Sequence, residues 1–478
     1  MVARNRLTLH SPLAEFLRRK PVTVLPDALV REVVELMAAE KVGSVVVVEP
    51  ESGRPMGIFT LRDLLHKVAL RGLDLDTMIL SVISDADLVM LNWRAKAYQA
   101  EMLLARYGIH HLMVVDAAGR LAGVVSQSDI LDVQRGNVKA LGMTIRDARD
   151  MHALEMAADD AQKVARRMLS EGVAAEQVMQ TLSTLNDLLA VRVVELTRRE
   201  FTLPQVPWCW LAFGSEGRFE QTLATDQDNG LVFECEPQAV DVMRQAFLPF
   251  AAAVNDRLDT CGFPLCKGNI MASNPELCLS SAEWRDRFTD WMRCGDPQAM
   301  LNATIFFDFR PIYGQEHLAE DLRRWLERSV PQEAMFLRFM AETAVKAKPP
   351  LGLIRDFVFD DDKAFPNTLD LKAFGSRIFV DAARILALAH GVGETSTAER
   401  LRTLVRRGAL AGEDVEAMVD GFFFIQKLRL LHQREDLREG EENRIDPDTL
   451  NELDRAVLKM AFKQSKKLQD VLQLTYRV

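Results

Sequence analysis

Two neighbouring stretches decide the fold of this 478-residue chain. Residues 208–220 read WCWLAFGSEGRFE, and residues 225–233 read TDQDNGLVF. In the first stretch, an apolar strand over 208–213 is predicted to run into a turn at Gly214 and Ser215, where the backbone can approach a phosphate group closely. The amide groups that begin the following helix would add donors and the positive end of a dipole. The first stretch therefore predicts a turn that binds an anion.

The second stretch places two carboxylates at the start of another apolar strand. Asp226 and Asp228 are two residues apart, and the period of two in a strand puts both side chains on one face. Proteins bind Mg²⁺ through one or two carboxylates together with substrate phosphates. Two such ions can stabilise both the entering and the leaving oxygen of a displacement. An isolated Asp-x-Asp is usually a solvated strand end, so the prediction of a magnesium site depends on the glycine turn before it.

Together these stretches resemble the nucleotidyltransferase superfamily of DNA polymerase beta, in which Gly-Gly or Gly-Ser is followed about ten residues later by Asp-x-Asp. They are most similar to the uridylyltransferase of the nitrogen-regulatory PII signal protein. There the turn is followed by Gly-Arg-x-Glu and Ser-Asp-x-Asp, which here are residues 217–220 and 225–228. The resemblance implies that Gly214, Ser215 and Arg218 bind a nucleoside triphosphate and that the aspartate pair holds Mg²⁺. An inactive copy of the fold is the alternative.

The superfamily needs a third carboxylate from a neighbouring strand, and Asp308 is the predicted candidate. It lies in residues 303–311, an aromatic and β-branched run that ends in a proline. A lone acid among apolar neighbours is unfavourable unless a cation pairs with it, and Mg²⁺ would be that cation. The resemblance implies that Asp308 is a shared metal ligand and the base for the acceptor hydroxyl. An ion pair of Asp308 with Arg218 or Arg310 is the alternative.

Basic side chains elsewhere could complete a nucleotide cleft. Residues 266–274 are rich in turn-forming residues, and Lys267 could reach a triphosphate or could equally be a solvated lysine. After about residue 331 the chain reads as helical to its end. Three basic residues of this tail could line the cleft from the far side, although solvated or ion-paired faces are the commoner environment for such side chains: they are Lys372, Arg384 and Arg429.

The amino-terminal third contains an internal repeat. Residues 45–63 and 112–129 each read as strand, Gly-Arg turn, strand and helix, and an amphipathic helix precedes each copy. The copies resemble CBS domains, which occur as tandem pairs and bind adenosine nucleotides in the clefts between them. The resemblance implies a homodimer formed through the pair, with AMP, ADP or ATP as ligand. It assigns phosphate and ribose contacts to Thr60, Asp63, Ser126 and Asp129.

The same four CBS residues also have a purely structural interpretation. Thr-x-x-Asp and Ser-x-x-Asp at the start of a helix are good N-terminal capping patterns. Such caps satisfy backbone N–H groups that lack a partner within the helix, and they need no ligand. The motif therefore leaves open whether these residues bind a nucleotide or only cap a helix.

The predicted fold class is multidomain α+β. Dividing the length by ~150 residues per domain gives about three domains as a prior, and the whole layout resembles a bacterial family of CBS-domain nucleotidyltransferases. The predicted parts are a tandem CBS pair over 1–138 (copies at about 14–72 and 78–136), a helical linker domain over 139–200, a polymerase-beta-type nucleotidyltransferase domain with a mixed sheet over 201–328, and an all-helical C-terminal domain over 329–478.

Composition excludes several other classes of protein. A formal net charge of −10 disfavours nucleic acid as a partner, because a nucleic-acid-binding domain needs a basic surface. No apolar run approaches the ~18 residues of a membrane-spanning helix, and the first residues lack the apolar stretch of a secretory signal. We therefore expect a cytoplasmic protein. The six cysteines form no Cys-x-x-Cys pair and show no zinc-ligand spacing with histidine, so we expect free, largely buried thiols.

These observations predict a Mg²⁺-dependent nucleotidyltransferase that moves a nucleoside monophosphate from a triphosphate to a hydroxyl group, with pyrophosphate leaving. By resemblance to PII uridylylation, the acceptor would be a protein, and the CBS pair would regulate transfer. No His-Asp doublet is present, so the phosphohydrolase domain that reverses PII modification is not visible in this sequence. The competing hypothesis is a sensor without enzymatic activity, in which a degenerate transferase domain relays the CBS ligand state to a partner protein.

Overall fold

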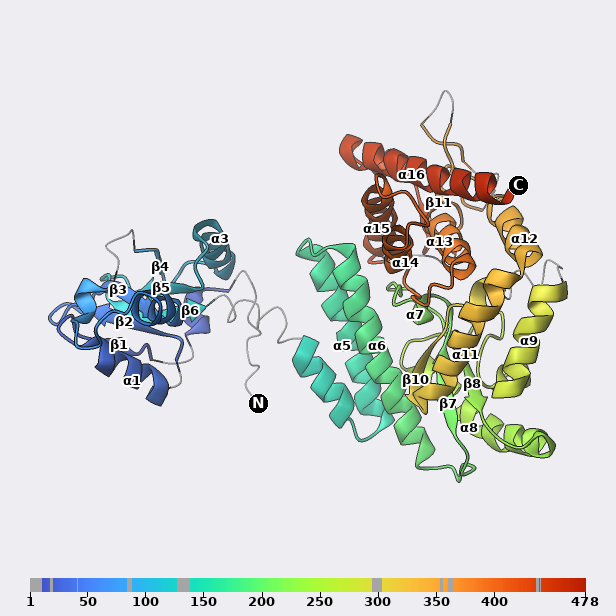
Figure 1. Ribbon diagram of the computed structural model, residues 1–478, viewed down its shortest axis with the longest axis horizontal. Coiled ribbons are helices and arrows are strands. Elements are labelled where there is room, and N and C mark those ends of the chain that lie inside the picture. The colour runs from blue at the N-terminus through green and yellow to red at the C-terminus, as the bar shows by residue number, and fades with distance from the viewer. Residues whose placement is uncertain are drawn as a thin grey trace. The chain divides into compact units, whose positions relative to one another are not determined.

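The computed structural model describes residues 11–17, 20–40, 42–83, 88–126, 138–294, 303–352, 356–359, 364–435, 438 and 440–478. The chain forms two compact units, Met1–Ala140 and Leu141–Val478. Each unit has its own apolar cores. Figure 1 shows both, with the first in blue to cyan and the second in green to red.

The first unit contains two three-stranded sheets of the same topology. In each sheet the first strand runs parallel to the second, and the second pairs antiparallel with the third. Both sheets even have a register irregularity at the same place, after Val47 in one and after Val114 in the other. The structure therefore confirms the internal repeat. Its elements are η1 (Leu13–Phe16), β1 (Thr23–Val24), α1 (Val30–Glu40), β2 (Ser44–Val48), β3 (Pro55–Thr60), α2 (Leu61–Asp63), η2 (Leu64–Ala69), η3 (Ile79–Ser81), β4 (Met90–Asn92), α3 (Ala97–Tyr107), β5 (His111–Val115) and β6 (Leu121–Ser126).

Each copy has a separate apolar core made by its helix and its sheet. In the first copy, Val33 of α1 packs with the valines of β2. In the second, Leu104 of α3 packs with Leu112 of β5. Leu13, near the amino terminus, is fully buried in the second core, and its backbone N–H donates to Ala95 O at 2.8 Å. The second copy is thus completed by residues that precede the first.

The second unit is built on a four-stranded mixed sheet in the order β10-β7-β8-β9. The central strand β7 (Trp208–Ala212) pairs antiparallel with both β8 (Asn229–Phe233) and β10 (Arg310–Gly314), and β8 runs parallel to β9 (Cys278–Ser280). Every residue of β7 and β8 is buried. Strands buried on both faces read as continuous apolar runs, which explains the composition of residues 208–213.

Helices cover both faces of this sheet. Cys209 and Leu211 point into a core shared with α9 (Ser281–Cys294) and α11 (Glu316–Ser329). On the opposite face, the rings of Trp208 and Trp210 lie against Phe250 of α8 (Val240–Thr260). The alternation follows from the period of two in a strand.

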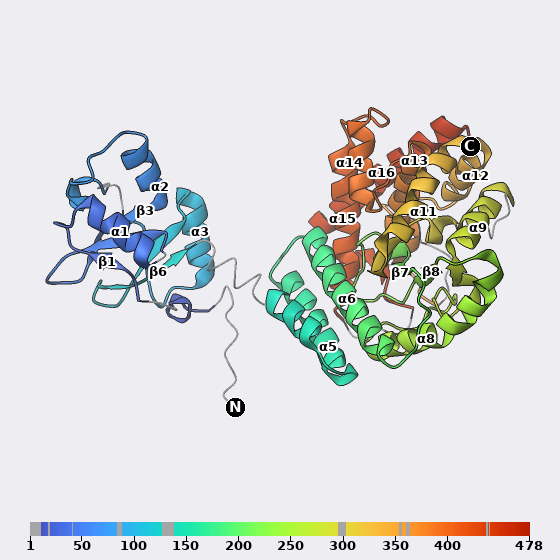
Figure 2. The ribbon, with the colours of Figure 1, turned by 60° about the horizontal axis from the view of Figure 1, so that its bottom comes forward.

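The helices before the sheet belong to the same compact unit. Residues 141–200, most of the predicted linker domain, form α5 (Met151–Ser170) and α6 (Ala175–Arg198). These lie side by side in both ribbon views (Figures 1 and 2). The apolar stripe of α6, which includes Leu182 and Leu189, is buried, and α6 packs against β10, α8 and α15. This segment is therefore part of the framework around the sheet.

The carboxyl-terminal region is helical and shares its core with the sheet. Leu211 of β7 belongs to the same buried cluster as Phe379, Ile425 and Phe462 of the tail. No helix among the described residues combines the length and apolar character needed to cross a membrane. The remaining elements are α7 (Gly214–Gly217), η4 (Pro237–Ala239), η5 (Pro275–Leu277), η6 (Val330–Gln332), α12 (Ala334–Ala344), β11 (Leu369–Asp370), η7 (Lys372–Ser376), α13 (Arg377–Ala389), α14 (Thr397–Arg406), α15 (Val415–His432), β12 (Arg444–Ile445), η8 (Pro447–Thr449) and α16 (Glu452–Tyr476).

Candidate functional site

The glycine turn lies at the end of β7 and faces the aspartate pair. Gly214 has a φ of +57°, a left-handed conformation that favours glycine. A Cβ at this position would lie 2.9 Å from Asp228 Oδ2, so the missing side chain keeps the space in front of that carboxylate open. Phe213 N donates to Asp228 O at 2.8 Å and joins the two stretches. The half-buried Ser215 follows in the first turn of α7, where helix N–H groups have no partner within the helix.

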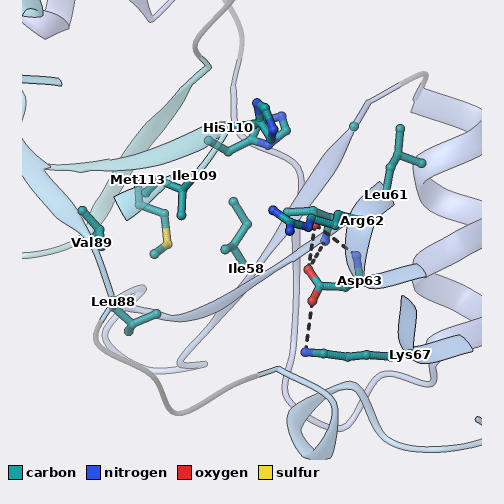
Figure 3. A pocket seen from close by; sticks show the side chains of 14 residues that line it. Ile58, Leu61, Arg62, Asp63, Lys67, Leu88, Val89, Ile109, His110 and Met113 are labelled. Atoms are coloured by element: carbon teal, nitrogen blue, oxygen red, sulfur yellow. Dashed lines mark hydrogen bonds and ion pairs between the residues drawn. The ribbon is translucent and has the colours of Figure 1, made fainter. Parts of the chain in front are cut away.

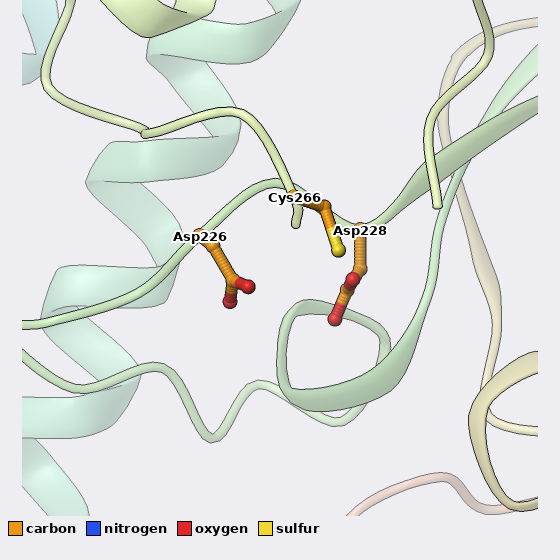
Figure 4. Close-up of side chains that lie close together, drawn as sticks. All are labelled: Asp226, Asp228 and Cys266. Carbon is orange, nitrogen blue, oxygen red and sulfur yellow. The ribbon is translucent and has the colours of Figure 1, made fainter. Parts of the chain in front are cut away.

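Asp226 and Asp228 come together with a thiol, as Figure 4 shows. One ligand atom each from Asp226, Asp228 and Cys266 lie within 4.8 Å of one another. Asp226 is exposed, and the other two are half-buried. Burial, and then the charge of Asp226, raise the pKa of Asp228 to about 7. Like charges held this close are what a bound cation would neutralise.

A buried network of amide side chains holds the pair and the loop that carries Cys266. The Gln227 side chain donates to Asn255 O at 2.9 Å and Phe263 O at 2.8 Å. Asn255 Nδ2 in turn donates to Gln227 Oε1 at 2.8 Å and to Asn229 Oδ1 at 2.9 Å. Backbone bonds from Gln227 N to Pro264 O and from Asn229 N to Ile270 O, both at 3.1 Å, tie the same loop down. Asp226 and Asp228 thus face the site, whereas Gln227 and Asn229 face the framework.

The sequence reasoning missed these amide residues. The signal was present, because Gln227 and Asn229 alternate with Asp226 and Asp228 where the chain enters an apolar strand, although β8 itself begins only at Asn229. Two polar residues pointing away from the site in a strand that becomes fully buried must find hydrogen-bond partners. Asn255 comes from α8, which no local pattern linked to the pair.

The structure does not bring Asp308 to the aspartate pair as the predicted third ligand. Residues 303–306 are helical, and Asp308 lies in the bend before β10, which is separated from β8 by β7. Its side chain is completely buried. Its carboxylate accepts hydrogen bonds from three guanidinium groups: Arg218 Nη1 at 2.9 Å, Arg384 Nη2 at 2.7 Å and Arg400 Nη2 at 2.6 Å.

The alternative interpretation of Asp308, an ion pair with Arg218, is therefore the arrangement present. Burial alone would raise the pKa of Asp308, but the charges of Arg384, Arg400 and Arg218 outweigh it and hold the pKa far below its usual range. The pair predicted with Arg310 is absent from the ion pairs of the described residues, since the Arg310 guanidinium bonds Asp187 at 2.6 Å. The physical reason is that helices α13 and α14 bring two further arginines to this bend.

The arginine cluster joins the glycine turn to the helical tail. Arg218 Nε donates to Glu220 Oε2 at 2.7 Å, and Glu220 Oε1 accepts from Thr397 N at 2.7 Å. Gly217 packs so tightly that a Cβ there would lie 2.2 Å from Asp308 O. Arg218, predicted to bind the triphosphate, thus has its side chain in an internal network. Residues far away in the sequence therefore support the glycine turn.

The three basic residues of the helical tail that could have lined the cleft lie in different environments. Arg384 is buried and bonds both Asp308 and Asp381. Arg429 is also buried and bonds Asn443 and Gln426. Lys372 is exposed, and its charge acts to lower the pKa of Asp228. Of the three, Lys372 is therefore the exposed one, and the two arginines belong to the buried framework.

Arg310 also supports the glycine turn, through contacts with Glu216 and Phe219. Arg310 Nε donates to Glu216 O at 3.0 Å, and its guanidinium carbon lies 3.7 Å from the centre of the Phe219 ring. Phe219 has a φ of +58°, an uncommon conformation for a residue with a side chain. Burial, followed by the charge of Asp187, raises the pKa of Glu216 to about 8. Lys267 is exposed on the loop next to Cys266.

The first unit contains a cavity of about 430 Å³ between its two copies, shown in Figure 3. Thr60, Asp63 and Lys67 line it from the first copy, and His110 and Met113 line it from the second. The lining combines an acid and a base with apolar walls. Such a combination suits a ligand with a polar end and a flat apolar part.

Thr60 and Asp63 also form the helix cap that the sequence left open. Asp63 N donates to Thr60 Oγ1 at 3.3 Å, and Thr60 N donates to Asp63 Oδ2 at 3.1 Å, which together make a capping box. Lys67 Nζ lies 3.0 Å from Asp63 Oδ1. In the second copy, Ser126 ends β6, opposite His111 of β5. Asp129 lies outside the described residues.

The donor set fits Mg²⁺ at the aspartate pair. Two carboxylates converge beside a glycine whose missing Cβ leaves room in front of Asp228. Carboxylate oxygens are ligands that Mg²⁺ prefers, and substrate phosphates and waters would supply the remainder. The third nearby donor, the Cys266 thiol, is not a ligand that suits this hard ion.

Comparison with protein families defines the class. Residues 159–298 match the family described as "Putative nucleotidyltransferase DUF294", and residues 334–476 match the "Putative nucleotidyltransferase substrate binding domain". Residues 13–70 and 95–136 match the CBS domain. The chain therefore belongs to the family of CBS-domain proteins that carry the DUF294 domain and its substrate-binding domain. The predicted family and multidomain α+β fold are confirmed.

Individual relatives match only about a quarter of the chain. An "Uncharacterized protein MK0525" of Methanopyrus kandleri is 34% identical over 122 residues, which are 26% of this chain and 62% of that protein. The inosine-5'-monophosphate dehydrogenase of Aquifex aeolicus is 31% identical over 111 residues, which are 23% of this chain and 22% of the enzyme. The chain thus spans less than two thirds of the length of either relative. Among solved structures, the "CBS domain protein PAE2072 from Pyrobaculum aerophilum complexed with AMP" is 31% identical and covers 25% of this chain and 95% of its own, with a TM-score of 0.24.

Proposed function

We propose that the second unit is a Mg²⁺-dependent nucleotidyltransferase that transfers a nucleoside monophosphate from a triphosphate to an acceptor hydroxyl group. The observation that carries the proposal is the convergence of Asp226 and Asp228, with donor atoms within 4.8 Å, on a glycine turn that keeps the space before Asp228 open. Bound Mg²⁺ would neutralise charge on the triphosphate and on the leaving pyrophosphate.

The residues of the chain have distinct roles in this proposal. Gly214 and Ser215 place backbone N–H groups at the triphosphate, and Asp226 and Asp228 hold the metal. Lys372 adds a positive charge on the side of Asp228. The cluster of Arg218, Arg384 and Arg400 around Asp308 orients the glycine turn.

The proton of the acceptor hydroxyl needs a base other than Asp308. Because its carboxylate is saturated by three guanidinium groups, Asp308 is a weak base.

The acceptor is proposed to be a protein, by resemblance to PII uridylylation. Transfer is tested by incubating the full chain with Mg²⁺ and each of the four α-labelled triphosphates, with and without cell lysate. Label should appear on a lysate protein and pyrophosphate should be released. Asp226→Asn should abolish both, whereas Asp241→Asn, at an exposed position on α8, should not. Equal labelling by wild type and Asp226→Asn would refute the proposal.

The CBS pair is proposed to regulate transfer by binding an adenosine nucleotide. The cavity of about 430 Å³ between the copies provides the volume, and Asp63 and Lys67 provide polar contacts at one wall. A ligand that prefers one arrangement of the pair would bias the transferase, and the coupling must be reciprocal for binding. The regulation requires that transfer substrates change the affinity for the adenosine nucleotide.

The arrangement around Asp308 favours a second candidate, a sensor without transferase activity. The carboxylate expected to complete the metal site is held by three arginines. In this alternative the second unit relays the CBS ligand state to a partner protein. Triphosphate binding to the second unit without pyrophosphate release in any lysate would support the sensor over the enzyme.

A further inference from the structure

We propose that Asp226, Asp228 and Cys266 form a site for a thiophilic divalent cation, Zn²⁺, in the absence of triphosphate. This inference rests on the proposed function in that the two carboxylates are shared with the Mg²⁺ site. It differs in the third donor. Cys266 supplies a sulfur atom, whereas the third ligand predicted for the Mg²⁺ site was a carboxylate.

The three donors have suitable positions. In a tetrahedral zinc shell, bonds of about 2.1 Å to oxygen and about 2.3 Å to sulfur put neighbouring donors roughly 3.5 Å apart. The ligand atoms here already lie within 4.8 Å of one another, so side-chain rotation closes the gap. Three protein donors with the fourth position left to water is a common arrangement for an open zinc site. Figure 4 shows the Cys266 sulfur on the same side as both carboxylates.

The framework holds the sulfur in place. Cys266 lies on a loop that is fixed by Gln227 N to Pro264 O on one side and by Asn229 N to Ile270 O on the other, so the loop is anchored at the residues that flank Asp228. Cys266 O also accepts from Asn269 N at 2.9 Å, which closes a tight turn directly after the thiol. A thiol on a fixed loop loses little freedom when it binds a metal.

Donor chemistry decides which cation binds. Thiolate ligands select zinc, whereas carboxylate and water select magnesium. When Zn²⁺ binds, the Cys266 S–H bond breaks, its proton passes to solvent and a Zn–S bond forms. The zinc-loaded state would occupy both aspartates, so Zn²⁺ and the Mg²⁺-triphosphate complex would exclude each other.

The test uses metal-free, full-length protein titrated with Zn²⁺ against a chromophoric chelator, and with Cd²⁺ followed by the ultraviolet charge-transfer band of a cadmium–thiolate bond. Wild type should bind Zn²⁺ and show the band. Cys266→Ser should weaken Zn²⁺ binding by more than about tenfold, which is what even outer-shell changes cost, and should lose the band. Cys235→Ser is the matched control, because Cys235 is also a half-buried thiol but is not in the cluster, and it should behave as wild type.

Absence of the cadmium band in wild type, or its persistence in Cys266→Ser, would overturn the proposal. Asp226→Asn gives an independent check should the serine variant fold poorly. Asp226 is exposed, so its substitution should weaken Zn²⁺ binding without unfolding the protein. Failure of this inference is separable from failure of the proposed function. Zinc binding through Cys266 without nucleotidyl transfer removes only the function, and transfer with no thiolate-bound metal removes only the zinc site.

Discussion

At the scale of single residues, Asp228 and Asp308 show how the surroundings decide the role of a carboxyl group. Asp228 lies beside another acid, and burial with that charge raises its pKa to about 7. Asp308 is more deeply buried, yet three guanidinium groups keep its pKa far below its usual range. The Asp228 carboxylate lies beside a like charge that a cation would neutralise, whereas three guanidinium groups already neutralise the Asp308 carboxylate.

Asp308→Asn should destabilise the second unit rather than alter a metal site. The substitution leaves three buried guanidinium groups without their shared anion, and breaking a buried ion pair costs about 3–5 kcal/mol. The free energy of unfolding in urea should fall by an amount of that order. Asp226→Asn, at an exposed position among like charges, is the control and should leave stability equal or slightly higher. If the Asp308→Asn variant were as stable as wild type but had lost Mg²⁺ binding, Asp308 would be a metal ligand after all.

The raised pKa of Asp228 predicts how stability depends on pH in metal-free protein. The pKa of about 7 in the folded state lies above the value of about 3.9 in the unfolded chain, so between them the folded state binds more protons. The contribution of Asp228 to stability is therefore greatest at acidic pH and is lost as pH rises toward 7. Asp228→Asn should remove this decline in urea unfolding measured with a chelator present. Parallel pH profiles for wild type and variant would contradict the predicted shift.

At the scale of elements, the site is a junction between a strand end, a turn and a loop. The turn follows β7, the aspartate pair precedes β8, and the loop after α8 brings Cys266. Gln227 and Asn255 hold the last two together with buried hydrogen bonds. Local strand and turn patterns could predict the first two parts, because each depends on neighbouring residues only.

Gly214→Ala should separate backbone strain from the collision with Asp228. Alanine at a φ of +57° costs about 1–2 kcal/mol in the left-handed region, and its Cβ would lie 2.9 Å from Asp228 Oδ2. We expect both lower stability and weaker Mg²⁺-triphosphate binding. Gly172→Ala is the matched control, since Gly172 also has a positive φ of +77° but no atom within 4 Å of the added Cβ. It should lose stability alone, and loss of binding in the control would show that strain is the cause.

At the scale of the whole molecule, separate cores predict separate unfolding. Among the described residues, the core clusters of the first unit lie between Leu13 and Val125, and those of the second lie between Ala165 and Leu472. Calorimetry of the full chain should therefore show two transitions. An adenosine nucleotide that occupies the cavity of about 430 Å³ should raise the temperature of the first unit's transition, because a ligand stabilises the unit that binds it.

Asp63→Ala distinguishes the ligand from the helix cap in the same experiment. Loss of the capping box alone should lower the first transition by the equivalent of about 0.5–2 kcal/mol and leave the shift by nucleotide unchanged. A role in binding predicts that the nucleotide shift shrinks as well. A single transition for the whole chain would contradict the separate unfolding of the two sets of cores.

Local sequence patterns were enough to predict the short-range parts of this protein. The repeat, the buried strand, the turn at Gly214, the Asp-x-Asp and the helical segments all follow from periods and motifs that span a few residues. The tandem CBS pair and the mixed sheet were predicted because these motifs resemble those of known families, and the family matches confirm that class.

The contacts between residues far apart in the sequence became known from the folded structure. Asp308 bonds Arg218, 90 residues before it, and Arg384 and Arg400, 76 and 92 residues after it. Cys266 reaches the aspartate pair because an amide network pins its loop. The strand order β10-β7-β8-β9 places the bend with Asp308 across β7 from that pair. Such contacts depend on how whole helices and strands pack, and a lone acid in an apolar run looks the same in sequence whether a metal ion or three arginines neutralise it.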